Sequence, residues 1–447
     1  MLVDLVLHNA KIWTTKGLIP AGLAIDKGRI FKIAKETNLP KSSTRLKLKE
    51  NIILPGLVDS HVHLRDQLLA YKENFCSGTT AAAAGGVTLV MDMPNNNPTT
   101  MDSKSLRERI KLAETQVIVN VAFCSAFPEN LREMHAIVGE GAVAFKLYLS
   151  EKIGGLNIND DESLSHAFNE ATKMNVPVAV HAEDREMLEQ GKEKMERVGR
   201  NDIDAYVKAH SPTAEEKAIN RVTRIAKKSD ALIHFCHLSS LAGLQAFSTA
   251  KNTGLPITCE ITPHHLLLSS KDLKRCKTLA LSDPPLRSRT DVEALWGALR
   301  LGLIDTIASD HAPHTIEEKK LASVWDAKPG IPGLETTLPL LLTQVNKKRL
   351  TIQDLVRLTS EKPATLFHLK DRGKLENGYW ADLVVIDIKQ EHKVDSSKFF
   401  SKAKYSPFDG SRVKGKLLKT FVNGLLVYDE GEIVTKPGTG QIIGCME

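Results

Sequence analysis

The sequence lacks several features that would assign it to a class at once. It has no uninterrupted apolar run of about 18 residues, so we expect no membrane span. The N-terminal stretch "MLVDLVLHNAKIW" lacks the basic-then-apolar order of a signal peptide. The six cysteines follow no framework spacing, and we interpret them as reduced thiols of a soluble cytoplasmic protein: Cys76, Cys124, Cys236, Cys259, Cys276 and Cys445.

The chain also lacks a strong excess of one charge. Sixty Lys and Arg residues against 54 Asp and Glu residues give a net charge of +6 over 447 residues. The basic residues are interleaved with acids, as in "EEKAINRVTRIAKKSD", a pattern typical of solvated helix faces. We therefore expect neither a nucleic-acid nor a membrane partner.

What the chain does have is a regular alternation of short β-branched runs with helical stretches. The helical stretches include "SKSLRERIKLAET", "DESLSHAFNEATKM" and "RTDVEALWGALRLG". The expected strands are Leu57–His63, Val87–Met93, Val117–Phe123, Val143–Tyr148, Val176–His181, Leu232–Leu238, Pro256–Thr262 and Ile304–Asp310. Eight strands with crossovers predict an α/β fold, a (β/α)8 TIM-type barrel. The competing doubly wound sheet usually carries a glycine-rich phosphate loop after its first strand, and none occurs there.

The two ends of the chain read as β-structure. "DLVLHNAKIWTTKG" and "AGLAIDKGRIFKIAK" are strand-like near the N-terminus, and "LLKTFVNGLLVYDEGEIV" near the C-terminus contains the hairpin signal Asn423-Gly424. We predict a small β-sandwich formed by residues 1–52 and 372–447, attached to a barrel formed by residues 53–371.

Polar residues gather where the barrel strands are expected to end, which is where barrel enzymes place their chemistry. They are His61, His63, Lys146, His181, His237 and Asp310. Side chains at i and i+2 of a strand share a face, so His61 and His63 can reach one ion. A single such histidine is most often a hydrogen-bonded core residue, but this set predicts a metal site.

Lys146 is the unusual member of this set. It could extend its stem to solvent or pair with an acid. Beside two divalent ions, however, an ammonium group would be repelled. A neutral amine that takes up carbon dioxide becomes a carbamate, an anion able to bridge two metals about 3.5–4 Å apart.

These residues lie in a series of longer motifs that spans essentially the whole chain. "DSHVHLRD", "MDMPNNNP", "FKLYLS", "HAED", "CHLSS", "CEITPHHLLLS", "SDPPLRSRTDVEALW" and "ASDHAPHT" resemble the cyclic amidohydrolases of the amidohydrolase superfamily, and within them most closely the dihydroorotases with a carboxylated lysine. "KPATLFHL" and "GKLENGYWADLVVID" are similar to the same family. The resemblance implies a metal-bearing barrel with a β-sandwich built from both termini.

The resemblance also implies roles for individual residues. His61, His63, Lys146 and Asp310 would hold one divalent ion, with zinc expected, and Lys146, His181 and His237 a second. Lys146 would be the carbamate, and Asp310 the catalytic proton shuttle of a hydroxide shared by the metals. The family reaction opens L-dihydroorotate to N-carbamoyl-L-aspartate, and its reverse builds pyrimidines.

Substrate class is indicated by three further residues. Arg65, Asn95 and His314 match the trio with which the family binds the ring carboxylate. A guanidinium can grip a carboxylate with two hydrogen bonds, and an amide and an imidazole add donors. Taken singly, Arg65 could form a surface ion pair and Asn95 could be a turn residue of "PNNNP".

One position departs from the family pattern, and the roles of two further residues are not decided by the sequence. Asp283 of "DPPLR" stands where the family has an asparagine that contacts the ring, and Arg287 could neutralise it. Cys236 and Glu260 could hold a further metal, although a packed thiol and a supporting acid are the simpler interpretation. Allantoinase, hydantoinase or dihydropyrimidinase activity remains an alternative, as does a non-catalytic scaffold for aspartate transcarbamoylase. We expect a homo-oligomer.

Overall fold

A computed structural model describes residues 2–444, and eight parallel strands form its central sheet. They pair in chain order: β6 (Leu57–Val62), β7 (Val87–Asp92), β8 (Asn120–Ala126), β9 (Ala142–Tyr148), β10 (Val178–His181), β11 (Ile233–Phe235), β12 (Ile257–Ile261) and β13 (Thr306–Ile307). A parallel bridge between Val62 and His311 connects the end of the eighth strand with the first. The expected (β/α)8 barrel is therefore confirmed.

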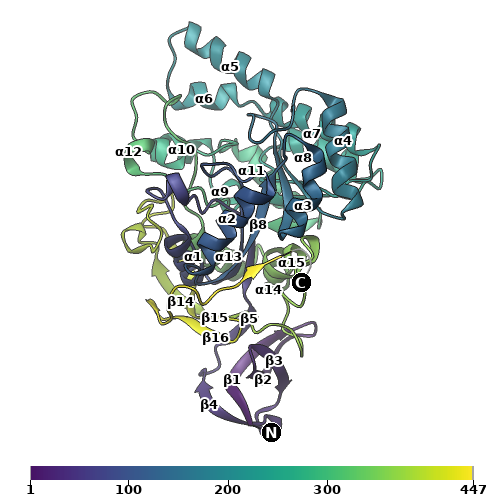
Figure 1. The fold of residues 1–447 in the computed structure, drawn as a ribbon. Helices are drawn as coiled ribbons and strands as arrows, with labels where there is room; N and C mark the ends of the chain where they lie inside the picture. The colour runs from purple at the N-terminus through teal and green to yellow at the C-terminus, as the bar shows by residue number, and fades with distance from the viewer. Residues whose placement is uncertain (1, 445–447) are drawn as a thin grey trace.

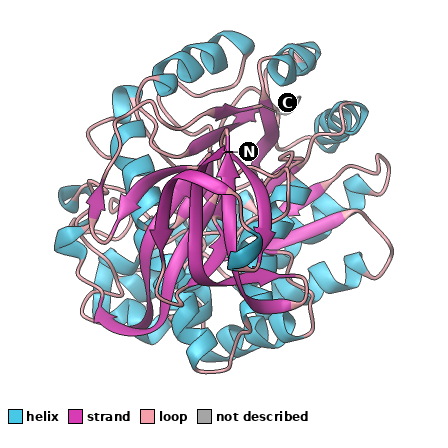
Figure 2. Ribbon diagram, turned by 90° about the horizontal axis from the view of Figure 1, so that it is seen from below, coloured by secondary structure: helices cyan, strands magenta, loops and turns pink. Residues whose placement is uncertain are grey.

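Helices follow the strands and surround them, as Figure 2 shows from below. Those between the strands are α1 (Phe75–Ala84), α2 (Ser103–Glu114), α3 (Met134–Gly139), α4 (Asp161–Lys173), α5 (Arg185–Arg197), α6 (Ile203–Ala209), α7 (Pro212–Ala226), α8 (Leu241–Lys251), α9 (Pro263–Leu267), α10 (Ser270–Cys276) and α11 (Arg289–Arg300). After β13 come α12 (Ile316–Lys319), α13 (Leu334–Asn346), α14 (Ile352–Val356) and α15 (Lys362–Leu366). In Figure 1, α5 and α6 lie at the top, at the end of the molecule away from the N-terminus.

Both ends of the chain contribute to a second, separate sheet. Its strands are β1 (Leu2–Thr14), β2 (Gly17–Asp26), β3 (Arg29–Ala34), β4 (Lys41–Lys47), β5 (Ile52–Pro55), β14 (Leu383–Lys393), β15 (Arg412–Val422), β16 (Leu425–Asp429) and β17 (Glu432–Ile433). Asn423 and Gly424, with φ of 48° and 79°, form the expected tight turn between β15 and β16. The short β18 (Ile442–Ile443) instead pairs with β8 of the barrel. The domain boundaries at residues 52 and 372 stay a proposal.

The barrel strands differ from expectation mainly at their ends. The third strand covers Asn120–Ala126, three residues later than expected, because the carbonyl of Val117 accepts hydrogen bonds from the C-terminal Gly438 and Gly440. The sixth and eighth strands end early, before His237 and Asp310. Positive φ angles of 35° and 47° turn these two residues out of the strand pairing. Such backbone conformations are costly and concentrate at functional sites.

Residues 2–444 contain neither a membrane-spanning helix nor a disulfide bond. None of their helices is long and apolar enough to cross a membrane. The five cysteines described there are all free thiols, as expected, and Cys445 lies outside the described residues.

Candidate active site

A cavity of about 510 Å³ opens at the carboxyl ends of the barrel strands. Its lining includes His61, His63, Arg65, Asn95, His181, His237, Asp283, Asp310 and His314 from the predicted site. The remaining predicted residues, Lys146, Cys236, Glu260 and Arg287, are buried behind this lining. The barrel therefore gathers residues from seven loops or strand ends in one place.

His61, His63 and Asp310 form the first candidate metal group. Oδ1 of Asp310 lies 3.2 Å from Nε2 of His63 and 3.5 Å from Nε2 of His61. The other ring nitrogens are held from behind: Nδ1 of His63 lies 2.6 Å from Oδ1 of Asn95, and Nδ1 of His61 contacts Glu260. Such partners fix the tautomer and leave Nε2 free to bind a metal. Burial lowers the pKa of His63 well below its ordinary value, which favours the neutral imidazole that metals require.

Lys146, His181 and His237 lie beside this group. Nδ1 of His181 is 3.0 Å from Nε2 of His237, and Nζ of Lys146 is 3.2 Å from Nε2 of His61. Burial, and then the neighbouring His181, lower the pKa of His237 well below its ordinary value. Nδ1 of His237 is buried without a hydrogen-bond partner among residues 2–444. The ring centroids of His237 and His61 are 5.3 Å apart, so these side chains adjoin the first candidate metal group.

Lys146 is buried, with no carboxylate of residues 2–444 within ion-pair distance. Its side chain is only 1% exposed, and its Nζ contacts His61 and, at 2.9 Å, Sγ of Cys236. No carboxylate of the described residues forms an ion pair with it. An ammonium group buried in this way without an ion pair is costly. The alternative that Lys146 pairs with an acid therefore has no support in the structure.

Glu260 and Cys236 could also be metal ligands, since both approach His61. The Glu260 carboxylate, however, already accepts hydrogen bonds from Nε2 of His234 at 3.2 Å and the backbone nitrogen of His237 at 3.1 Å. The carboxylate also contacts His61 and accepts a hydrogen bond from the Ser60 hydroxyl at 3.3 Å, so all four of its acceptor positions have a partner. Glu260 is therefore placed to orient other residues of the site.

Arg65 is a buried cation in the lining of the cavity. It is 7% exposed; its Nε donates to the carbonyl of Pro313 at 3.4 Å, and its Nη2 lies 3.2 Å from Nε2 of His314. Within residues 2–444 it forms no ion pair with a carboxylate. Behind His314, Lys72 contacts Nδ1 of that ring at 3.2 Å and pairs with Glu318 at 2.8 Å. This cationic wall of the cavity can receive an anion.

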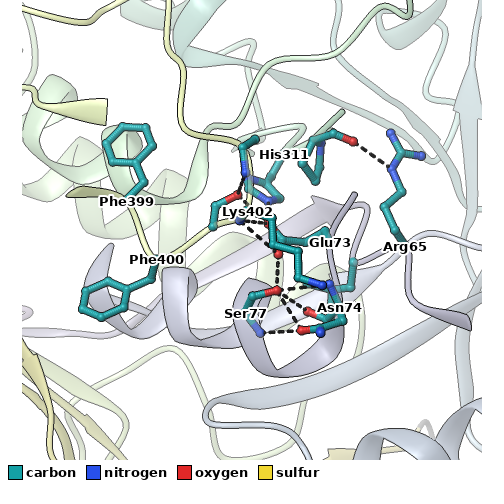
Figure 3. Close-up of polar contacts among 12 residues, drawn as sticks. Arg65, Glu73, Asn74, Ser77, His311, Phe399, Phe400 and Lys402 are labelled. Carbon is teal, nitrogen blue, oxygen red and sulfur yellow. Dashed lines mark hydrogen bonds and ion pairs between the residues drawn. The ribbon is translucent and has the colours of Figure 1, made fainter. Parts of the chain in front are cut away.

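A polar network fixes the loop that carries Arg65 (Figure 3). Glu73, which is fully buried, accepts hydrogen bonds from Ser401 and from the backbone of Lys402, and its carboxylate lies 3.5 Å from Nε2 of His311. Glu73 thereby joins the loop after β6, the segment after β14 and the residue that follows Asp310. Sequence reasoning missed this residue, because its partners lie far away in the chain.

Asp283, which lines the cavity, and Glu183, which is buried behind the lining, form an acidic wall; Lys192 and Lys328 also line the cavity. Asp283 lies 3.1 Å from Nδ1 of His210, and Glu183 lies 3.3 Å from the same nitrogen. Arg287 contacts Glu183 at 3.6 Å and donates to the Ser239 hydroxyl at 3.0 Å. The idea that Arg287 neutralises Asp283 is therefore wrong: the cation beside Asp283 is His210.

Sequence reasoning also missed His210 and Glu183. Glu183 lies in the motif "HAED", two residues after His181, and this was the only local signal for it. Together with His181, Glu183 and Asp283 form a third group of possible metal ligands, but His210 contacts both carboxylates.

The comparisons define the class of this protein. The model of the amidohydrolase family matches residues 52–427, which include the whole barrel, and the chain belongs to that family.

The relatives of this chain include dihydroorotases and a hydantoinase. The chain is 36% identical to a dihydroorotase of Methanosphaera stadtmanae, covering 96% of this chain and 97% of that protein. It is 35% identical to a dihydroorotase of Pyrococcus horikoshii, covering 99% and 96%. Among solved structures, an L-hydantoinase (dihydropyrimidinase) from Arthrobacter aurescens is similar, with a TM-score of 0.95, 32% identity and coverage of 99% of this chain and 100% of that one.

Proposed function

We propose that this amidohydrolase is a dihydroorotase that interconverts L-dihydroorotate and N-carbamoyl-L-aspartate in pyrimidine biosynthesis. The observation that carries the proposal is Arg65, a buried guanidinium with no carboxylate partner among the described residues, in the same cavity as the candidate metal groups. Its missing partner would be the ring carboxylate of the substrate, since a charge-assisted pair compensates a buried cation.

His314 and Asn95 support the same substrate. His314 shares the cationic wall with Arg65, and burial, together with the nearby Arg65 and Lys72, lowers its pKa far below the ordinary value. As a neutral ring it adds no charge of its own, and its two nitrogens contact the guanidinium of Arg65 and the ammonium of Lys72. Asn95 gives its carbonyl oxygen to His63, which leaves its amide nitrogen as a donor to the carboxylate.

We further propose that two divalent ions, zinc in the first instance, bind at the two adjoining groups of donors. The first would use His61, His63, Asp310 and a carbamate on Lys146, and the second Lys146, His181 and His237. When bound, such ions lower the pKa of water and polarise a carbonyl oxygen. The carbamate would remove the cost of burying an uncompensated ammonium at Lys146.

Asp310 would move the proton. Its carboxylate lies at the cavity floor between His61 and His63, and burial raises its pKa. It can accept a proton as water attacks the ring amide and then donate that proton to the departing ring nitrogen. Arg65 would hold the ring so that the scissile amide, and not the carboxylate, faces Asp310.

The deciding experiment is ring opening by the purified protein. L-dihydroorotate, hydantoin, allantoin and dihydrouracil are compared with and without a chelator. Chelator-sensitive turnover of L-dihydroorotate in preference to the uncharged rings is expected. Preference for an uncharged ring would refute the dihydroorotase proposal while keeping the metal site. No turnover of any ring by the metal-loaded protein would favour the scaffold alternative.

The carbamate has its own test. Lys146→Ala should lose bound metal and activity, and short-chain carboxylic acids should restore part of both by replacing the missing anion. Mass analysis of the native protein should show added carbon dioxide on Lys146. Full activity of Lys146→Ala without rescue would refute the role.

A second candidate function is hydantoinase activity, favoured by the similarity to the L-hydantoinase structure over the whole chain. The same assay decides between the two rings. The homo-oligomer, a complex with aspartate transcarbamoylase and a cytoplasmic location stay predictions; size measurement alone and with that enzyme tests the first two.

A further inference from the structure

The acidic wall poses a problem for an enzyme whose substrate is an anion. Asp283 lines the cavity, with its side chain 31% exposed, in a protein proposed to bind one carboxylate in one direction and two in the other. A free carboxylate here would repel both substrates. At an effective dielectric constant of about 20 and a separation of roughly 10 Å, such repulsion weakens binding about tenfold.

The topology separates this wall from Arg65. Arg65 follows β6, the first strand, whereas His210 and Glu183 follow β10, the fifth. In a closed eight-stranded barrel the first and fifth strands lie across the barrel from each other. His210 thus lies across the barrel from Arg65. Asp283, which follows the seventh strand β12, lines the same cavity, as do Lys192 and Lys328.

His210 is built to compensate the acidic side. Its Nδ1 contacts both Asp283 and Glu183, and the Tyr206 ring stacks on its imidazole with centroids 4.2 Å apart. Burial by itself would lower the pKa of His210, but the facing carboxylates of Asp283 and Glu183 raise it to about 10. Arg287 supplies a second cation to Glu183 from behind. His210 is therefore the contact that neutralises Asp283.

We infer that His210 is a specificity-determining residue: by pairing with Asp283 it keeps that carboxylate from repelling the anionic substrates, so the two residues act as one unit. The inference rests on the proposed function. With Asp283 compensated, the uncompensated charge that a substrate carboxylate meets in the cavity is that of Arg65. The pair would thus help to orient the ring with its carboxylate toward Arg65.

The test is a double-mutant cycle with metal-loaded protein. We compare wild type, His210→Gln, Asp283→Asn and the double variant, measuring kcat, KM and bound metal in both reaction directions. His210→Gln should raise KM for L-dihydroorotate about tenfold, and more for the dianionic N-carbamoyl-L-aspartate, with a smaller change in kcat. The double variant should recover most of the KM that His210→Gln loses, and Asp283→Asn should not raise KM as His210→Gln does, because neither leaves an uncompensated charge at position 283.

Two further variants separate charge from structure. His210→Arg keeps the positive charge and should stay within about threefold of wild type in KM. His135→Gln is the matched control: this histidine is 63% exposed, and its Nε2 lies 3.8 Å from Glu170, so its loss should change nothing.

The outcomes are distinct. A double variant as impaired as His210→Gln, or equal KM changes for the two substrates, would overturn the inference while leaving the dihydroorotase proposal intact. A tenfold loss in metal-loaded His210→Arg would do the same. Failure of the wild type to turn over L-dihydroorotate would overturn the proposed function and this inference with it.

Discussion

The two walls of the cavity treat charge in opposite ways. On one wall, Arg65 is buried and has no acid among the described residues. On the other, Asp283 and Glu183 share His210, and Arg287 adds a further cation. This difference indicates where an anionic ligand binds. A binding site for an anion has a cation without a partner in the protein, as at Arg65, whereas charged groups that do not bind the ligand are paired within the protein.

The largest expected effect concerns the metal groups that lie between the two walls. Asp310→Asn keeps the shape of the side chain but cannot accept a proton, so kcat should fall by about a thousandfold or more. Metal analysis alongside steady-state kinetics should find metal still partly bound. Near-normal turnover in this variant would exclude the proton-shuttle role.

The second-largest effect is expected from removing the positive charge of Arg65 from the cationic wall. Arg65→Gln removes the proposed partner of the substrate carboxylate and should lower kcat/KM for L-dihydroorotate about a hundredfold. Turnover of an uncharged ring, where measurable, should fall much less. Equal losses on charged and uncharged rings would show that Arg65 does not recognise the carboxylate.

The free energy of unfolding tests the same contrast, by comparing Arg65 with a second buried arginine that does have an acid partner. Arg109 is fully buried and pairs with Asp92 at 2.8 Å through Nε, so Arg109→Gln leaves a buried acid alone and should cost about 3–5 kcal/mol. Arg65→Gln removes a cation that has no such partner, and it should leave the free energy of unfolding of the ligand-free protein unchanged or higher. Denaturant unfolding of both variants measures the contrast. Equal destabilisation would mean that Arg65 is structurally paired.

The smallest expected effect is a pH dependence of the thermal stability that His210 contributes at the acidic wall. Because the pKa of His210 is raised from 6.5 to about 10, its stabilising contribution is complete below pH 6.5 and is lost as the pH rises toward about 10. The advantage of wild type over His210→Gln in Tm, on the order of 2 °C, should therefore shrink over that range. Thermal unfolding of the two proteins at several pH values tests this. A constant difference would argue that His210 does not carry the charge.

The sequence alone determined the architecture and the chemical inventory. Alternating strand and helix patterns predicted the barrel, because hydrophobic period and turn residues are local properties. The i, i+2 spacing of His61 and His63 predicted a shared face for the same reason. The tight turn at Asn423-Gly424 needed only two residues in a left-handed conformation.

Only the tertiary structure decided which charges meet. His210 reaches Asp283 from a different loop, Glu73 reaches Ser401 from a distant part of the chain, and Arg65 forms no ion pair with a carboxylate of residues 2–444. No local pattern encodes such contacts, because they depend on how the strand-end loops converge over the barrel. The strand ends at His237 and Asp310 belong here too. Histidine and aspartate adopt a left-handed backbone more readily than most residues, but the sequence does not show which of them do so.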